Sequence, residues 1–383
     1  MTACPGDHPI RVLRIIARMN VGGPAWQASA LTSGLDPRAF ESRLLCGRVD
    51  EGEADFLDLR HPDLPVRRIS TLGRGVHPVD DLRALVAIRR EIRSFRPHLV
   101  HTHTAKAGVL GRLAAISCRV PLRVHTHHGH LLKGYFGSVV VRMIRVVESF
   151  LARHTSALVA VGARVRDELL DVGIGRAEQY TVIPPGVESG EIPPGREGQE
   201  ALGLAEGAQV VLFVGRLTRI KRFDRLIEAM AIVIQEAPDV LLVVVGEGDE
   251  LEEAQRSSRS LGAAVQFLGW RAELGSLYEA ADVVVLTSDS EGMPVSLIEA
   301  AMAGRPCVTT DVGSAGEVVI HEETGYVVPP DPEAIARALL TLLRDDDLRR
   351  RMGDAARRLA KRHYSVQRLV SDHELLYRRL VEG

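Results

Sequence analysis

Short apolar runs alternate with amphipathic stretches along the whole chain. The runs Val210–Val214 and Val240–Val245 have the length of strands and are rich in β-branched residues. They lack the alternation of apolar and polar residues that marks a strand with one solvent-exposed face. The stretch Asp80–Phe95 instead has its apolar residues at helical spacing and ends just before Pro97. Strands that alternate with helices predict parallel sheets covered by helices on both faces.

The same interpretation extends to both halves of the chain. In the first half we expect strands at Arg11–Ala17, Ser42–Cys46, Val66–Ile69, Leu99–His101, Leu122–Thr126 and Ala157–Val161, and helices at Pro24–Gly34, Asp80–Phe95, Lys106–Ser117, Tyr135–His154 and Arg164–Val172. In the second half we expect strands at Val210–Val214, Val240–Val245, Val265–Leu268, Val283–Thr287 and Pro306–Thr309, and helices at Phe223–Glu236, Glu250–Leu261, Leu274–Ala281, Val295–Ala303 and Pro332–Leu343.

A break in this alternation divides the chain. With 383 residues it is longer than a typical single domain. The stretch Ile183–Arg196 reads IPPGVESGEIPPGR, and its proline and glycine content indicates a linker. We therefore expect one α/β domain over residues 1–186 and another over residues 187–365, with a ligand cleft where the carboxyl ends of their strands face one another. The final residues 366–383 contain an amphipathic segment, Val366–Leu380.

Composition and charge narrow the possible partners. The net charge is -2 and aromatic residues are only 4% of the chain, which argues against a nucleic-acid partner. The four cysteines are scattered without a zinc or redox motif, which is typical of reduced thiols in the cytoplasm. The start of the chain lacks the apolar core of a signal peptide, and no uncharged apolar run is long enough to span a bilayer. We therefore expect a cytoplasmic protein.

The stretch Asp289–Pro306 carries the most informative chemistry. Glu291 and Glu299 lie eight positions apart, and Pro294 between them favours a helix start, because proline is accepted in the first turn. Glu291 would then precede the helix and Glu299 would lie in its second turn, on either side of amides at the positive end of the helix. One interpretation is that those amides bind a phosphate while the two carboxylates bind sugar hydroxyls. The alternative interpretation is that Glu291 and Glu299 are simply solvated charges at a helix end.

Two cations strengthen the first interpretation. Arg216 and Lys221 lie in the loop after the strand Val210–Val214. An arginine fork and a lysine point charge suit a diphosphate, and they would stabilise a departing nucleotide diphosphate without a metal. A basic surface cluster remains the alternative.

Glycine pairs follow two of the predicted strands. Gly22–Gly23 and the pair Gly246 and Gly248 could let backbone approach a phosphate, or could simply make turns. The first pair does not complete a G-x-G-x-x-G motif, and no acidic residue is well placed for a dinucleotide ribose. A dinucleotide-dependent oxidoreductase is therefore disfavoured.

Histidines gather near two strand ends. Because they end or follow predicted strands, we expect them to face the cleft; they are His101, His103, His125, His127, His128 and His130. Three interpretations stay open: contacts to sugar hydroxyls or to an acceptor, hydrogen-bonded structural histidines, or a metal site. The last lacks a companion cysteine or carboxylate cluster nearby in the sequence.

Taken together, these motifs resemble glycosyltransferase family 4, which comprises retaining enzymes of the GT-B fold. The resemblance spans nearly the whole chain, and the pairing of GR-x4-K at Arg216 and Lys221 with E-x7-E at Glu291 and Glu299 is its specific part. It implies two Rossmann-like domains whose parallel sheets face an interdomain cleft, with residues 366–383 packed back on the first domain.

The resemblance also implies roles for individual residues. Glu291 and His128 match positions at the donor sugar and the reacting centre. The positions that match donor contacts are Gly23, Arg216, Lys221, Gly292, Met293, Val295, Glu299 and Trp270. Among them Glu299 would hold the ribose, and Trp270 either lines the base pocket or is a core residue. His103 and Lys106 fall on the acceptor side.

Three positions depart from the usual family pattern. Many members carry an aromatic residue in place of His127, a glycine in place of Pro294 and a serine in place of Gly162. These departures leave the donor class intact and affect the acceptor side. The segment Leu131–Arg153, with arginines among apolar residues, either touches a membrane surface peripherally or is a core helix with exposed arginines.

The resulting hypothesis is a retaining, metal-independent hexosyltransferase without a cofactor. It would move a sugar from a nucleotide-diphosphate donor, preferably a UDP-sugar, to a glycan or polyprenyl-linked acceptor in cell-surface polysaccharide synthesis, at the inner face of the membrane. A UDP-sugar 2-epimerase of the same architecture and a non-catalytic sugar-nucleotide-binding subunit are the alternatives.

Overall fold

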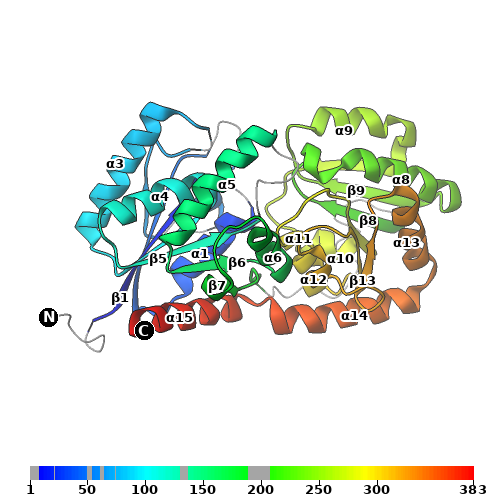
Figure 1. Cartoon of the computed structure of the whole chain (residues 1–383). Helices are drawn as coiled ribbons and strands as arrows, with labels where there is room; N and C mark the ends of the chain where they lie inside the picture. Colours follow the sequence, from blue (N-terminus) through cyan, green and yellow to red (C-terminus); the bar gives the residue numbers. More distant parts are fainter. Residues whose placement is uncertain are drawn as a thin grey trace. The chain divides into compact units, whose positions relative to one another are not determined.

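The computed structural model describes residues 8–20, 22–49, 54–60, 64–73, 75–129, 137–188 and 208–383. The chain forms two compact units. Unit 1 combines the described residues before Val187 with Val366–Gly383, and unit 2 is Val187–Ser365. Each unit is built around its own sheet (Figure 1).

Unit 1 contains a seven-stranded sheet in the order β3-β2-β1-β4-β5-β6-β7, and every strand pair in it is parallel. The chain order reverses between β1 and β4, so the loops after these strands diverge there. The strands are β1 (Ile10–Ile16), β2 (Phe40–Cys46), β3 (Val66–Arg68), β4 (Leu99–His103), β5 (Leu122–His127), β6 (Ala157–Ala160) and β7 (Tyr180–Val182).

Helices cover both faces of this sheet (Figure 1). One hydrophobic core joins the sheet to α3 and α4, through residues such as Ile88 and Ala114. A second core, on the other face, joins the sheet to α1 and α15 through Leu31, Leu369 and Tyr377. The helices of unit 1 are α1 (Gly23–Gly34), α2 (Phe56–Arg60), α3 (Pro78–Phe95), α4 (Ala105–Ser117), α5 (Ser138–Arg153), α6 (Ala163–Asp171), the short η1 (Ala177–Gln179) and α15 (Val366–Glu382).

Unit 2 contains a six-stranded sheet in the order β10-β9-β8-β11-β12-β13, again parallel throughout. Its central strands are buried apolar runs, which explains why their bounds follow the hydrophobic pattern closely. The strands are β8 (Gln209–Val214), β9 (Val240–Val245), β10 (Val265–Gly269), β11 (Val283–Leu286), β12 (Cys307–Thr310) and β13 (Gly325–Val328).

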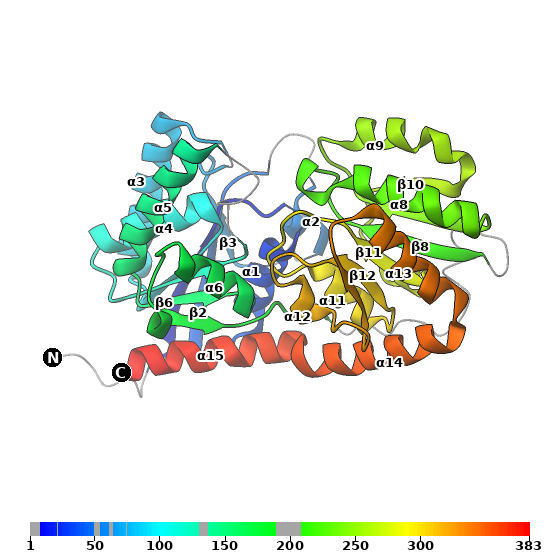
Figure 2. The same ribbon diagram turned by 45° about the vertical axis from the view of Figure 1, so that its right-hand side comes forward.

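The helices of unit 2 pack on that sheet and on one another, and α8 and α13 lie side by side in both views (Figures 1 and 2). Here the chain order reverses between β8 and β11. The helices are η2 (Arg219–Lys221), α8 (Phe223–Glu236), α9 (Leu251–Ser257), η3 (Ser258–Ala264), α10 (Gly275–Ala280), α11 (Val295–Met302), α12 (Ala315–Val318), α13 (Pro332–Arg344) and α14 (Asp346–His363).

The structure confirms the predicted α/β alternation and corrects it at several points. The sequence pattern missed the short elements α2, β7, α12 and β13, and it missed α14, whose many charges hide an apolar face made by Met352, Ala356 and Ala360. The helix expected at Glu250–Leu261 ends at Ser257 and continues as a 3-10 segment. The predicted linker runs beyond the described residues after position 188, and the predicted start of the helix at Tyr135 also lies outside them.

Two further observations concern the described part of the chain. Near the linker, the Trp26 indole Nε1 donates a hydrogen bond to the Gly186 carbonyl at 2.5 Å, so the chain leaves unit 1 from a fixed point. Among the described helices, none is both long and apolar enough to cross a membrane.

Candidate functional site

The reversal of strand order in unit 2 places two loops side by side. The loops after β8 and β11 begin at neighbouring strands, and ligands of parallel α/β sheets bind at such a point. Hydrogen bonds join the two loops directly. The Asp289 amide donates to the Ile220 carbonyl at 2.8 Å, and the Thr287 hydroxyl donates to the Lys221 carbonyl at 3.1 Å. The predicted cations and the predicted carboxylates are therefore brought to one place.

Lys221 and Glu291 form an ion pair at the centre of this arrangement. The Lys221 Nζ lies 2.5 Å from Glu291 Oε1, and their side chains are 18% and 10% exposed. The Ser288 hydroxyl donates to the same oxygen at 2.5 Å. An ammonium has three donors, so the pair orients Lys221 and leaves donors for a phosphate oxygen. Ser288 was not predicted, although it stands three positions before Glu291.

Glu299 lies in the second turn of α11, as predicted. Its Oε2 accepts a hydrogen bond from the Tyr278 hydroxyl of α10 at 2.8 Å. Burial, followed by the nearby Glu299 charge, raises the pKa of Tyr278 well above its usual range, so the phenol keeps its proton and remains a donor. Tyr278 thus fixes the direction of the Glu299 carboxylate. Nothing in the sequence marked it as part of the site.

The loop before α11 is tightly held. Val295 begins the helix, which agrees with the start of the predicted range Val295–Ala303, and Pro294 is the N-cap residue rather than a residue of the first turn. The Gly292 carbonyl accepts from the Ser314 amide at 2.9 Å. Gly313 has a φ of +47°, and a Cβ there would lie 1.8 Å from the Glu291 carbonyl oxygen, so only glycine fits.

Arg225 anchors the same loop from the other side. Its side chain is buried on α8 and donates to the Thr287 carbonyl at 2.7 Å, and it forms an ion pair with Asp289 at 2.7 Å. Arg222 reaches the same carboxylate at 3.1 Å. The signal that could have revealed Arg225 is its place among the buried residues of an amphipathic helix, where an arginine needs partners.

The glycines after β9 serve the fold of the loops. A Cβ on Gly246 would lie 2.1 Å from the Gly215 carbonyl oxygen, and one on Gly248 would lie 2.2 Å from that of Leu217. The two loops are also joined by a hydrogen bond from the Leu217 amide to the Glu247 carbonyl at 2.9 Å. These glycines thus permit close approach of one protein loop to another, directly beside the half-buried Arg216.

Trp270 follows β10 and is half-buried, so it is not one of the fully buried core residues. Its amide donates to Glu247 Oε1 at 3.4 Å, which ties it to the loop after β9. Its role in binding a base stays a prediction.

The histidines of unit 1 lie deeper than expected. His101 and His103 belong to β4, and His125 and His127 belong to β5; all four are buried. Both strands run further than predicted, so that His103 ends β4 and His127 ends β5, and the expectation that these histidines face the cleft stays a prediction. His101 is a hydrogen-bonded structural residue, with Nδ1 2.6 Å from the Tyr377 hydroxyl and Nε2 2.7 Å from that of Thr126.

His103 is connected to the predicted reacting-centre residue. Its Nδ1 lies 3.0 Å from Nε2 of His128, which follows the end of β5. Burial, followed by the neighbouring His127, lowers the pKa of His128 to about 3. Burial also lowers the pKa of His103 well below its usual range. At neutral pH both rings are therefore uncharged, and the N–H of one ring donates a hydrogen bond to the bare nitrogen of the other. His130 lies outside the described residues.

A metal could be considered only at one cluster of the described residues. Ligand atoms of His125, His127 and Glu148 lie within 4.8 Å of one another. However, both Glu148 oxygens accept hydrogen bonds from Arg112 Nη2, at 2.8 and 2.7 Å, and Arg112 is fully buried. The carboxylate already has a cationic partner, so this cluster fits a buried ion pair better than a metal site.

The remaining unit 1 candidates have clear positions. Gly23 is the first residue of α1, and the preceding Gly22 carbonyl accepts from the Trp26 amide at 3.1 Å. Lys106, on α4, pairs with Asp81 at 2.5 Å and also donates to the Gly75 carbonyl. Lys106 is therefore engaged within unit 1, and its acceptor role stays a prediction.

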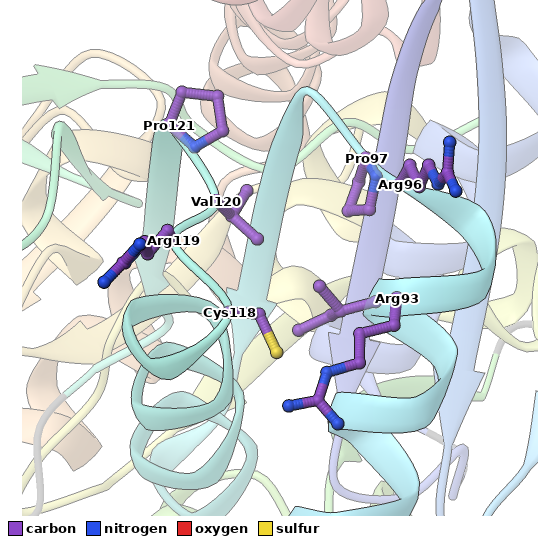
Figure 3. Close-up of a pocket in the computed structure, with 8 residues that line it drawn as sticks. Arg93, Arg96, Pro97, Cys118, Arg119, Val120 and Pro121 are labelled. Carbon is purple, nitrogen blue, oxygen red and sulfur yellow. The ribbon is translucent and has the colours of Figure 1, made fainter.

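A shallow pocket elsewhere in unit 1 is not a competing site. It lies between the carboxyl ends of α3 and α4, beside Pro97 and Pro121, which precede β4 and β5. It is thus at the amino ends of the strands, away from the predicted site residues. Figure 3 shows Arg96 and Arg119 extending to opposite sides, so their charges do not converge on a common ligand.

The chain thus consists of two Rossmann-like units with parallel sheets, and unit 2 carries a lysine–glutamate pair ahead of a helix. This combination is typical of a GT-B-type protein. A crystal structure of HepE from Anabaena, in complex with UDP and glucose, matches this fold with a TM-score of 0.82 and 23% identity, over 97% of this chain and all of that chain. The lipopolysaccharide biosynthesis glycosyltransferase WaaG matches with a TM-score of 0.74 and 18% identity, over 95% of this chain and 98% of that chain.

Family comparison gives the same answer for the sequence. Residues 22–186 match the glycosyl transferase 4-like domain, and residues 196–359 match glycosyl transferases group 1. The chain belongs to glycosyltransferase family 4, and it is a glycosyltransferase.

Bacterial relatives are similar over most of their length. UDP-Gal:alpha-D-GlcNAc-diphosphoundecaprenol alpha-1,3-galactosyltransferase of Escherichia coli is 28% identical over 316 residues, which cover 80% of this chain and 81% of that protein. The capsular polysaccharide biosynthesis glycosyltransferase CapM of Staphylococcus aureus is 23% identical, over 85% of this chain and 88% of that protein.

Proposed function

We propose that this enzyme transfers a hexose from a UDP-sugar to a lipid-linked or glycan acceptor in cell-surface polysaccharide synthesis, with retention of configuration and without a metal. The names of the bacterial relatives support this substrate class, since one uses UDP-galactose and a diphosphoundecaprenol acceptor and another acts in capsule synthesis. The observation that carries the proposal is the Lys221–Glu291 pair just before α11.

The donor would be held by the two joined loops of unit 2. Lys221 and Arg216 supply positive charge for the diphosphate, and the amides of Gly292, Met293 and Val295 add the positive end of α11. Glu299, oriented by the Tyr278 hydroxyl, suits a pair of ribose hydroxyls as a hydrogen-bond acceptor. Trp270 would lie against the base.

Glu291 has a double function in this scheme. Its carboxylate fixes Lys221 through one oxygen, which also accepts from Ser288. A carboxylate has about four acceptor sites, so Glu291 can accept from sugar hydroxyls at the same time. It thereby couples the position of the sugar to the position of the cation that receives the departing phosphate.

The transfer itself needs no protein nucleophile. The bond between the anomeric carbon and the phosphate oxygen breaks, and its electron pair leaves with UDP, whose growing charge Lys221 and Arg216 stabilise. The acceptor hydroxyl oxygen bonds to the oxocarbenium-like carbon on the face from which UDP departs. Its proton passes to the departing phosphate oxygen, so the configuration is retained.

Unit 1 would supply the remaining contacts. By resemblance, Gly23 approaches the donor diphosphate and His128 lies near the reacting centre, with His103 behind it at 3.0 Å. A neutral His128 suits this task, because an uncharged ring can accept or donate one hydrogen bond without repelling a cationic sugar. His103 and Lys106 are assigned to the acceptor side on the same basis.

Product analysis tests this proposal directly. With a panel of UDP-sugars and an undecaprenyl-diphosphate sugar acceptor, we expect a new glycosidic bond with the anomeric configuration of the donor, seen by NMR, and full activity in EDTA. An inverted product would sink the mechanism. Release of UDP with an epimerised sugar in the absence of acceptor would identify a 2-epimerase, and donor binding without any turnover would identify a non-catalytic subunit.

We place the enzyme in the cytoplasm, at the inner face of the membrane, because a polyprenyl-linked acceptor is held there.

A further inference from the structure

Two histidine rings of unit 1 share one hydrogen bond, and its direction determines what His128 can do. Nδ1 of His103, the last residue of β4, lies 3.0 Å from Nε2 of His128. The centroids of the two rings are 5.3 Å apart. Because Nε2 of His128 is engaged in this bond, Nδ1 is the ring nitrogen that remains for a ligand. Nδ1 carries a proton if His103 donates, and it carries a lone pair if His128 donates.

The surroundings of His103 keep its ring neutral. The side chain is fully buried, and its ring centroid lies 4.3 Å from that of His101. Burial, followed by the neighbouring His101, lowers the pKa of His103 well below its usual range, and the buried guanidinium of Arg14 on β1 acts in the same direction. A neutral His103 has one N–H and one bare nitrogen.

The second nitrogen of His103 decides between the two directions. Within the part of the chain that the structure describes, its Nε2 is buried and has no hydrogen-bond partner. If His128 donated, the proton of His103 would lie on Nε2, and a buried N–H would have no acceptor, which is costly and rare in folded proteins. If Nδ1 of His103 donates instead, its N–H is satisfied and a bare nitrogen is left in the interior.

Another histidine shows that the interior of unit 1 accepts a bare nitrogen. Nδ1 of His373, on α15, lies 2.8 Å from the Leu369 carbonyl oxygen. A carbonyl oxygen accepts and cannot donate, so the proton of His373 is on Nδ1. Its Nε2 is therefore bare, and it too is buried without a partner among the described residues. The arrangement inferred for His103 repeats one that the fold already contains.

The backbone immediately after His103 is strained. Thr104 has a φ of +64° and a ψ of 159°, a conformation that a β-branched residue rarely adopts. Its hydroxyl accepts a hydrogen bond from the Ala17 amide at 3.3 Å, which ties the turn to the end of β1. Such strain is concentrated at functional sites, where the direction of a neighbouring group has to be maintained. Here that neighbouring group is His103.

We propose that His103 is a positioning residue that donates from Nδ1 to Nε2 of His128, so that His128 presents an Nδ1–H to the donor sugar as a hydrogen-bond donor and not as a base. The identity of that ligand rests on the proposed function, whereas the two tautomers are a property of the free protein. A fixed donor matches a lone pair of a sugar oxygen. It cannot remove the proton of the acceptor hydroxyl, which agrees with the passage of that proton to the departing phosphate.

NMR of the histidine side chains tests the direction of the bond without any substrate. In protein that contains isotope-labelled histidine, the nitrogen chemical shifts distinguish a protonated ring nitrogen from a bare one. The signals of the two rings are identified by their loss in His103→Asn and in His128→Gln. At pH 7 we expect a proton on Nδ1 of both rings. A proton on Nε2 of His128 would overturn the proposal, whatever the activity of the enzyme.

Two variants of similar size extend the test to turnover. The amide of His103→Asn can donate from the place of Nδ1, so we expect it to keep the His128 tautomer and most of the turnover. His103→Leu has no donor, so the proton of His128 should distribute over both nitrogens and kcat should fall about 10- to 100-fold, as for other partners that orient a functional histidine. Equal losses in the two variants, at unchanged melting temperature, would contradict the donor role of His103.

The matched control is His373→Asn, the same exchange at another buried histidine of unit 1, which should leave both the His128 tautomer and kcat unchanged. A loss in this control as large as that in His103→Leu would overturn the proposal, because turnover would then respond to any change among the buried histidines. Expected tautomers in a wild-type protein that transfers no sugar would instead contradict the proposed function and leave the role of His103 towards His128 intact.

Discussion

The two units share one architecture but place their polar groups differently. In unit 1, titratable side chains occupy the interior of the central strands, with Arg14 on β1, His101 and His103 on β4 and His125 on β5, all buried. In unit 2, the central strands β8, β9 and β11 carry no titratable side chain, and the charged residues lie in the loops that follow. Polar side chains buried in strands mainly make hydrogen bonds that hold the fold, whereas polar side chains in loops can contact a ligand.

This difference predicts which changes affect activity and which affect stability. In unit 2, substitution of a charged loop residue should reduce turnover while the fold stays intact. In unit 1, substitution of a buried polar strand residue should mainly reduce the free energy of unfolding.

The largest expected effect is on turnover in unit 2. Lys221→Ala and Glu291→Gln should each lower kcat by about 100- to 1000-fold, because the departing diphosphate loses a positioned charge or the group that positions it. The melting temperature should change little. Arg219→Ala, an exposed cation in the same loop, is the matched control and should retain activity. If the control loses as much activity as Lys221→Ala, the loop acts only through its overall charge.

The next effect is on stability in unit 1. His101→Leu removes both hydrogen-bonding nitrogens from the strand interior and leaves the hydroxyls of Tyr377 and Thr126 buried without this partner. We expect the free energy of unfolding to fall by about 2–4 kcal/mol, measured by urea denaturation. A matched change in unit 2, Val243→Thr on β9, should cost about 1–3 kcal/mol by burying one hydroxyl. A neutral His101→Leu would show that this histidine is not a structural residue.

A smaller effect is expected at the anchor of the unit 2 loop. Arg225→Met keeps an unbranched, largely apolar side chain but removes the guanidinium contacts to Asp289 and to the Thr287 carbonyl. We expect kcat/KM to fall about tenfold, mainly through KM, because the loop that carries Glu291 is held less firmly. Arg225 acts through the loop, so Arg225→Lys, which can retain one contact, should recover part of the loss. An unchanged KM with a large fall in kcat would instead place Arg225 among the groups that act on the reaction itself.

The smallest effect is a pH dependence confined to unit 1. Burial lowers the pKa of His128 and of His373 to about 3, whereas an unfolded histidine titrates near 6.5. As pH falls below about 6.5 the unfolded chain takes up protons that the folded unit excludes, so stability declines toward pH 3 and is constant above 6.5. At pH 5.5 we expect a loss of the order of 1 kcal/mol for each histidine.

Hydrogen exchange at pH 7 and pH 5.5 measures this difference unit by unit. The described histidines of unit 2, His321 and His363, are exposed, so the central strands of unit 2 serve as the internal reference. If protection in β8 and β9 falls as much as protection in β4 and β5, the buried histidines are not the cause.

The sequence predicted some elements residue by residue and others not at all, for physical reasons. The bounds of α8 and β9 agree with the prediction, because α8 has apolar residues at regular helical spacing and β9 is a continuous apolar run. Strand β4 was predicted to stop at His101, because a histidine looks polar in a hydrophobic pattern even where hydrogen bonds satisfy it. Short elements such as β13 depend on neighbouring strands, which a local pattern does not reveal.

The candidate site shows the same limit. The individual residues Lys221 and Glu291 were predicted as donor contacts, but their direct pairing joins positions 70 residues apart and emerges only when β8 and β11 become neighbours. The supports of the site, Tyr278 and Arg225, were missed because each acts through another side chain. Sequence motifs report groups that would touch a ligand more readily than groups that hold them in place.

The interlocked glycine loops of unit 2 have a practical consequence for redesign. A methyl group on Gly313 would collide with the Glu291 carbonyl oxygen, and one on Gly246 or Gly248 would collide with a carbonyl oxygen of the loop after β8, so the main chain has little room to move at these contacts. A library intended to change which sugar is accepted should therefore vary side chains such as Ser288 and keep these glycines constant. A new selectivity then has to come from the side chains, since the loop backbone has little room to shift.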